Sequence, residues 1–161
     1  MVNIEIIPAY DYPREVGALF SEYTGMLIAG DSSFREYLAI QHYDEEIAHL
    51  EMKYGLPWGR LYLARCGEEW AGCIGMRKMD GQNCEMKRLY VRPRFRGRRI
   101  GEALVRRIIA DARGIGYAHM LLDTLPFLGS AVHLYQKYGF YEIESYNDSP
   151  VGSSIYMRLD L

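Results

Sequence analysis

Arginines crowd one short segment of the chain, with glycines among them. Five of the eight residues from 92 to 99 are arginine, and Gly97 and Gly101 lie within and just after that run. Forked guanidinium donors suit phosphate oxygens, and glycines let a ligand approach the backbone closely. An apolar run ends at Val91 and an amphipathic run begins at Ile100. The pattern predicts a strand, an anion-binding turn and the start of a helix.

The same segment carries a resemblance to a known family. Residues 91 to 104, V-R-P-R-F-R-G-R-R-I-G-E-A-L, resemble the acetyl-coenzyme A loop of the GNAT superfamily of N-acetyltransferases. That loop reads Arg or Gln, two residues, Gly, one residue, then Gly or Ala. Arg96 and Gly101 match its ends, and Arg99 stands where the middle glycine usually is.

A second segment supports the resemblance. Residues 131 to 140, A-V-H-L-Y-Q-K-Y-G-F, resemble the helix-to-strand junction of the family, in the expected order and spacing. Rival phosphate loops fit poorly, because the segment has neither G-x-G-x-x-G nor a lysine followed by Ser or Thr. The resemblance is specific over residues 60 to 161 and general over the first fifty.

The resemblance implies how a proton would be handled. Acetyl transfer needs a neutral amine, whereas an alkyl ammonium has a pKa of about 10.4, so a nearby carboxylate is useful. Glu85 lies eleven residues before Arg96, where some members of the family place a general-base glutamate. Glu85 can equally be a surface strand residue that pairs with Lys87 or Arg77. Tyr135 matches the family's general-acid tyrosine, and it can equally be a core aromatic.

The resemblance also implies the contacts of the acyl donor, acetyl-CoA. Backbone groups of Leu89, Tyr90 and Val91 would bind its pantetheine arm as a surrogate strand. A regular strand would place Glu85 on the face of Leu89 and Val91. The remaining expected contacts come from the loop and from a later helix: Arg96, Gly97, Arg98, Arg99, Ile100, Gly101 and Ser130.

Composition is that of a single enzyme domain spanning residues 1 to 161. The chain is 49% hydrophobic and 25% charged, and its net charge is −2. A nucleic-acid contact by the arginines is a further reading, but the near-neutral charge favours a local phosphate site. No apolar run is long enough to span a membrane, and the N-terminus lacks the pattern of a signal peptide. These features predict a cytoplasmic protein.

Cysteine and histidine spacings suggest no metal or redox chemistry. Cys66, Cys73 and Cys84 show no C-x-x-C spacing, and we expect them to be buried and reduced. His42 and His49 recur with Glu46 at helical steps, but a fixed site usually needs more ligands and a second shell of supporting groups. We expect no metal.

Periodicity predicts an α+β fold. The resemblance makes it a mostly antiparallel sheet of six to seven strands, with a central splayed parallel pair and about four helices. Ser33 and Glu36 would cap a second helix that runs to about residue 53, within a lid-like segment, 31 to 58, that contributes to the acceptor site. Strands are expected at 3–7, 60–66, 70–78, 84–91, 118–123, 140–146 and 153–159, and the other helices at 14–29, 99–113 and 129–138.

The acceptor is the least defined part of the prediction. Candidate contacts are the acids 44 to 46, the strand end at residues 123 and 124, and the loop 146 to 150, although all of them can be solvated surface. The expected activity is direct transfer of acetyl from acetyl-CoA to a primary amine of a small molecule or peptide, in a ternary complex. The alternative is a non-catalytic acyl-CoA sensor. A sheet edge near the C-terminus could pair two copies in a homodimer.

Overall fold

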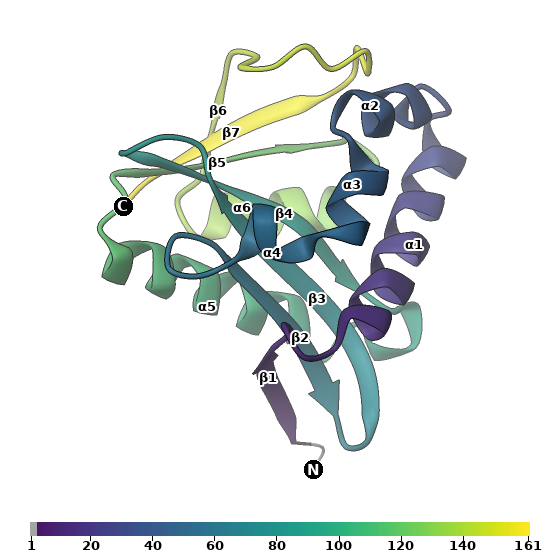
Figure 1. Ribbon diagram of the computed structural model, residues 1–161. Coiled ribbons are helices and arrows are strands. Elements are labelled where there is room, and N and C mark those ends of the chain that lie inside the picture. Colours follow the sequence, from purple (N-terminus) through teal and green to yellow (C-terminus); the bar gives the residue numbers. More distant parts are fainter. Residues whose placement is uncertain (1–2) are drawn as a thin grey trace.

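One seven-stranded sheet organises the molecule, for which a computed structural model describes residues 3 to 161 (Figure 1). The strand order is β1-β2-β3-β4-β5-β7-β6, and only β4 and β5 run parallel. The predicted α+β class and splayed parallel pair are therefore confirmed. The strands are β1 (Ile4–Pro8), β2 (Arg60–Cys66), β3 (Glu69–Lys78), β4 (Asn83–Val91), β5 (His119–Thr124), β6 (Tyr141–Ile143) and β7 (Ile155–Asp160).

Helices cover both faces of the sheet. They are α1 (Pro13–Gly30), α2 (Phe34–Ile40), α3 (Tyr43–Ala48), α4 (Leu50–Tyr54), α5 (Ile100–Ile115) and α6 (Gly129–Lys137), with a 3₁₀ turn at Pro93–Phe95. The alternation of β2 shows the two layers, because Tyr62 packs in the core beneath α5 whereas Leu61 and Leu63 pack beneath α1 and α4. Each face of the sheet thus has its own apolar core.

The predicted second helix is wrong in its continuity. Three short helices, α2 to α4, replace it, because His42 adopts a left-handed φ of 56° and His49 leaves the helical conformation, with φ of −140° and ψ of 65°. The breaks let α2 bury Phe34 in one core cluster while α4 buries Tyr54 in another. Ser33 does not cap α2, since its hydroxyl donates to an Asp31 oxygen at 2.5 Å instead.

The parallel pair is short, and this shapes the centre of the molecule. Pairing between β4 and β5 covers only Asn83 to Glu85, although β4 continues to Val91 and β5 to Thr124. Beyond these three residues the strands separate, as Figure 1 shows where β4 and β5 diverge. From residue 86 to residue 91, the edge of β4 that faces β5 therefore has no strand neighbour in the described chain.

A bulge interrupts β4 just after the point of separation. Arg88 has a left-handed φ of 61°, and the register of β3 against β4 shifts between Cys73 and Gly75. The extra residue moves Leu89 to the face beneath α5, while Glu85 stays on the opposite face. The prediction that Glu85 shares a face with Leu89 and Val91 is therefore wrong.

The sheet edge near the C-terminus is β6 and not the last strand. β7 lies between β5 and β6, and β6 has only three residues. A homodimer through this edge stays a prediction, with β6 as the strand that would pair. Residues 1 and 2 of the predicted domain lie outside the described residues.

Candidate active site

A groove of about 640 Å³ gathers most of the residues expected to bind the acyl donor. It lies where β4, the loop after it, the N-terminal turn of α5 and helix α6 meet. The expected residues in its wall are Leu89, Tyr90, Val91, Arg96, Gly97, Arg99, Ile100, Gly101, Ser130 and Tyr135. Arg98 does not line the groove, because its guanidinium lies 5.4 Å from the Phe95 ring and its Nη1 is 3.7 Å from the Cys66 sulfur.

The loop at one end of the groove has the backbone that an anion site needs. Gly97 and Arg99 both lie in the left-handed region, with φ of 81° and 61°, and α5 begins at Ile100. The first amides of a helix have no carbonyl partner within it, and its dipole favours an anion there. A left-handed backbone at residue 99 explains why a glycine is usual there, since a side chain at this position is strained.

Gly101 lies where α5 faces β4 and borders the groove. A β-carbon at this position would make an ordinary contact with a Val91 methyl group, at 3.7 Å. Arg96, which is exposed, donates to the Val91 carbonyl at 3.1 Å and so links the loop to the strand.

Tyr135 lies at the inner end of the groove. Its side chain is buried, and burial raises the pKa of its phenol well above the usual range. The structure shows no hydrogen bond from its hydroxyl to any of residues 3 to 161. A neutral phenol without a protein partner is suited to donate a proton to a ligand atom. Tyr23 of α1 lines the same place, and burial raises its pKa to about 12.

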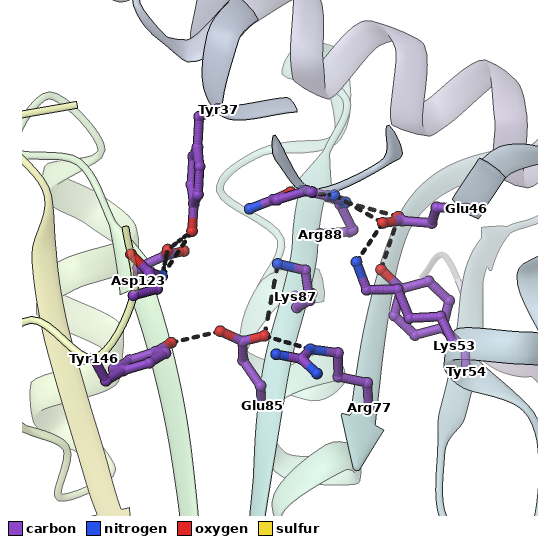
Figure 2. A network of polar contacts seen from close by, with 12 residues as sticks. Tyr37, Glu46, Lys53, Tyr54, Arg77, Glu85, Lys87, Arg88, Asp123 and Tyr146 are labelled. Atoms are coloured by element: carbon purple, nitrogen blue, oxygen red, sulfur yellow. Dashed lines mark hydrogen bonds and ion pairs between the residues drawn. The ribbon is translucent and has the colours of Figure 1, made fainter. Parts of the chain in front are cut away.

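Glu85 lies outside this groove, in a second and larger cleft of about 1200 Å³. Its carboxylate accepts from Arg77 Nε at 2.7 Å and from the Tyr146 hydroxyl at 2.5 Å, and it lies 3.7 Å from Lys87 Nζ. Figure 2 shows these three groups around it. Burial opposes the charge of Glu85, but Lys87 and Arg77 outweigh burial and lower its pKa to about 2. Glu85 is thus an ion-paired carboxylate, and it is buried rather than on the surface.

A small cavity of about 30 Å³ lies between the groove and the cleft, where β4 and β5 separate. It shares Tyr23, Leu89, Leu128 and Tyr135 with the groove, and Tyr37, Gln41 and Lys87 with the cleft. An acyl donor in the groove and an acceptor in the cleft would approach each other here. The arrangement therefore provides two entrances and one meeting point.

The cleft contains a network of charged residues, and one of them, Glu46, is among the acids that the sequence offered as acceptor contacts. Glu46 is buried and accepts from Arg88 Nε and Lys53 Nζ at 2.9 and 2.7 Å (Figure 2). These partners lower the pKa of Glu46 to about 2, although burial opposes them. Burial and the neighbouring Lys87 lower the pKa of Lys53 to about 8, against the attraction of Glu46. Glu46 is therefore not the solvated helix residue that its sequence context allows.

Asp123 also belongs to this network. It accepts from the Tyr37 hydroxyl, and from Asn147 Nδ2 at 3.0 Å. Of the predicted acceptor contacts, Glu45, Glu46, the strand end at residues 123 and 124, and the loop at residues 146 to 148 line the cleft or the small cavity. The pairing of Glu85 with Lys87 or Arg77 was one of the sequence interpretations and both pairs are present, whereas Arg88 gave no signal beyond its charge. The placement of Lys87 and Arg88 depends on the bulge and on the separation of the strands.

The remaining sequence expectations concern cysteines, metals and membranes. Cys66, Cys73 and Cys84 are buried free thiols, and burial raises the pKa of Cys84 to about 12. Among residues 3 to 161, no group of three or more His, Cys, Asp or Glu side chains is arranged to hold a metal ion. No helix in this part of the chain has both the length and the apolar character to cross a bilayer.

The groove fits acetyl-CoA on its own residues. Arginines and glycines at the helix N-terminus suit the phosphates, and the β4 edge without a strand neighbour suits the amides of the pantetheine arm. The buried phenol of Tyr135 lies at the inner end, toward the small cavity. The order of these features along the groove follows the order of groups in the molecule.

Comparisons with known proteins agree with this geometry. Residues 27–140 match the acetyltransferase (GNAT) family model. An uncharacterized N-acetyltransferase of Schizosaccharomyces pombe is 43% identical over 126 residues, which are 77% of each chain. An uncharacterized N-acetyltransferase of Dictyostelium discoideum is 29% identical, over 98% of this chain and 99% of that protein.

Solved structures show the same fold. An acetyltransferase from Streptococcus agalactiae superposes with a TM-score of 0.76 at 21% identity, over 98% of both chains. The PaiA N-acetyltransferase from Thermoplasma acidophilum, solved in complex with coenzyme A, superposes with a TM-score of 0.73 at 20% identity, over 99% of both chains. With the family match covering well over half of its length, the chain belongs to the GNAT family of acetyltransferases and is an acetyl-CoA-dependent acyltransferase.

Proposed function

We propose that the protein transfers the acetyl group of acetyl-CoA directly to the nitrogen of a primary amine, with both substrates bound at once. The observation that supports direct transfer is the small cavity, which shares its walls with the groove on one side and with the cleft on the other. A groove for the acyl donor and a cleft for the acceptor, both bordering this cavity, suit a complex in which the two substrates are bound together. A covalent acyl-enzyme is not needed for this arrangement, and the three thiols are buried.

The donor would bind along the groove, with its phosphates over the loop 96 to 101. Its thioester would reach Tyr135. The amine nitrogen attacks the thioester carbonyl carbon, a C–N bond forms, and the C–S bond breaks as the thiolate leaves. Tyr135 is proposed as the catalytic acid that protonates the leaving sulfur, because it is a buried phenol with no hydrogen-bond partner in the described chain.

The nitrogen must also lose a proton, and Glu85 was the predicted base. Its ion pairs with Arg77 and Lys87 make it a weak base, since a pKa of about 2 lies far below that of an ammonium group. We propose that the acceptor enters as the neutral amine and that Glu85 positions the two cations. Tyr135 gives its proton to the leaving sulfur, and the nitrogen gives its own proton to the resulting Tyr135 phenolate, so the step balances without a separate strong base.

The test is thiol release from acetyl-CoA with a panel of amines, followed beside calorimetric binding of acetyl-CoA. Thiol release with an amine, and an N-acetylated product by mass spectrometry, would support the proposal. Tight binding of acetyl-CoA with no release from any amine would favour the acyl-CoA sensor instead. Initial rates at varied concentrations of both substrates should give intersecting lines, whereas parallel lines would contradict the ternary complex.

A further inference from the structure

Lys87 is a buried ammonium group that faces the meeting point of the two substrate paths. Its side chain is only 6% exposed, yet it lines both the small cavity and the cleft. Its nearest carboxylate oxygen, on Glu85, lies 3.7 Å from Nζ, which is beyond hydrogen-bonding distance. No residue from 3 to 161 accepts a hydrogen bond from Nζ. The N–H donors of Nζ therefore remain available to a ligand, and the ion pair with Glu85 is the one contact within 4 Å that a carboxylate of the described residues makes with them.

The carboxylates nearby are already shared with other cations. Glu85 is hydrogen-bonded by Arg77, and Glu46 by both Arg88 and Lys53. Asp123 is occupied by a tyrosine and an asparagine. The network in Figure 2 thus holds four cationic side chains, Lys53, Arg77, Lys87 and Arg88, against three carboxylates. One positive charge is left over, at the inner end of the cleft.

The outer part of the cleft has a different character. Four of its lining residues are large apolar side chains that are at least 48% exposed: Ile40, Met52, Leu56 and Trp58. Glu45, Glu51 and Asp148 also lie there, but they are exposed, so solvent and salt screen their charges. The cleft therefore combines an apolar mouth with a cationic interior.

We infer that the acceptor is an α-amino acid with an apolar or aromatic side chain, and that Lys87 binds its carboxylate. Because Lys87 borders the small cavity, the carboxylate and the attacking amine must lie within a few bonds of each other. The apolar side chain of the acceptor then lies at the mouth of the cleft. Polyamines and aminoglycosides, which bring several positive charges, fit this interior poorly. The inference rests on the proposed transfer to an amine and names its substrate class.

The experiment compares three acceptors that differ only in the carboxylate. Thiol release is measured with L-phenylalanine, with L-phenylalaninamide and with phenethylamine, on the unmodified protein. L-phenylalanine should have the highest kcat/KM, by about 10- to 100-fold, the usual effect of a hydrogen bond to a charged group. The amide has the less basic amine and hence more of the neutral form, so intrinsic reactivity favours it. Equal or better turnover of the amide or of phenethylamine would overturn the inference and leave the proposed function standing.

Variants then assign the effect to one side chain. Lys87→Met should raise KM for L-phenylalanine about 10-fold or more and leave KM for phenethylamine nearly unchanged, so that the preference disappears. Arg113→Met, in the last turn of α5 and exposed outside the cleft, is the control for loss of one positive charge and should keep the preference. Retention of the full preference in the Lys87 variant would overturn the role of Lys87.

A binding measurement separates this inference from the proposed function. Calorimetry with coenzyme A present compares N-acetyl-L-phenylalanine with its amide, and needs no turnover. Tighter binding of the acid than of the amide, with the difference lost in Lys87→Met, would support the carboxylate site. This result would stand even if no amine released thiol, and in that case only the proposed function would fail. Equal binding of acid and amide would overturn the site. Circular dichroism of the variant confirms that it is folded, and Lys87→Arg, which keeps the charge, should retain part of the preference.

Discussion

Two tyrosines present their phenols to the small cavity, and only one can be the main acid. Tyr135 comes from α6 and Tyr23 from α1, and both line the groove as well as the cavity. Burial raises the pKa of both phenols. Both rings also pack on an aromatic neighbour, Tyr23 on Tyr90 at 5.8 Å and Tyr135 on Phe140 at 5.7 Å between centroids, so packing does not distinguish them.

The pair allows a matched test. Tyr135→Phe should lower kcat by about 100-fold or more, the usual contribution of a general acid, and leave the affinity for acetyl-CoA almost unchanged. Tyr23→Phe removes a phenol oxygen from the α1 side of the small cavity and should lower kcat much less. Steady-state kinetics and calorimetry measure the two properties. The assignment fails if the Tyr23 variant loses more activity than the Tyr135 variant.

Glu85 can be tested through the pH dependence of the rate. In Glu85→Gln, we expect kcat/KM for the acceptor to fall, because Arg77 and Lys87 lose their shared partner. The rise of the rate with pH should remain, because it follows the pKa of the amine itself rather than that of Glu85. Rate profiles from pH 6 to 10 measure this. If the rise disappears in the variant, Glu85 is the base after all.

At the scale of elements, the loop before α5 combines a chemical requirement with a backbone requirement. Arg99 supplies a guanidinium group to the groove but adopts the left-handed φ that suits glycine. The family's usual glycine satisfies the backbone alone. This chain therefore keeps a charged side chain at the expense of some local stability.

A pair of variants separates the two requirements. Arg99→Gly and Arg99→Ala both remove the guanidinium, but only glycine relieves the strained φ. The glycine variant should be more stable than the alanine variant by about 1 kcal/mol, and both should bind acetyl-CoA more weakly than the unmodified protein. Urea unfolding and calorimetry measure these properties. Equal urea midpoints would show that residue 99 is not strained in solution.

At the scale of the whole molecule, buried carboxylates link stability to pH. Glu46 and Glu85 both have pKa values of about 2 in the folded protein, lowered from 4.5 by their cationic partners. A lowered pKa stabilises the fold above pH 4.5, and this stabilisation is lost as the pH falls toward 2. It amounts to about 3 kcal/mol for each group. We therefore expect the urea midpoint to fall steeply between pH 4.5 and 2.

Glu46→Gln should change this profile as well as the stability. The variant leaves Arg88 and Lys53 buried with a neutral partner, so the protein should lose about 3 to 5 kcal/mol at pH 7. Its stability should then fall less between pH 4.5 and 2, because one titrating group is gone. Urea unfolding at a series of pH values tests both effects. A variant as stable as the unmodified protein would contradict the structural role of the pair.

The sequence predicts best what is decided locally. The loop 96 to 101 was predicted because its glycines and arginines suit an anion at a helix N-terminus, and this depends only on neighbouring residues in the sequence. The helix expected over residues 33 to 53 was wrong, because its local pattern is helical but the burial of Tyr54 and the ion pair of Glu46 require breaks. Lys87 was expected only as a partner of Glu85, and its place at the small cavity was missed because that place depends on a bulge and on the separation of two strands distant in sequence. Long-range contacts of this kind leave no periodic signal.

The short pairing of β4 with β5 also divides the sheet into two unequal parts. Three residue pairs join the antiparallel strands β1 to β4 to the group of β5, β7 and β6. We expect so short a backbone pairing to let the two parts open separately, although the core beneath α5 contains side chains from both. Native-state hydrogen exchange should show amides of β5 and β7 opening at a lower free energy than those of β2 and β3. Acetyl-CoA bound where the two parts separate should reduce the difference between these two opening free energies. The acyl donor would then stabilise the folded molecule as well as serve as its substrate.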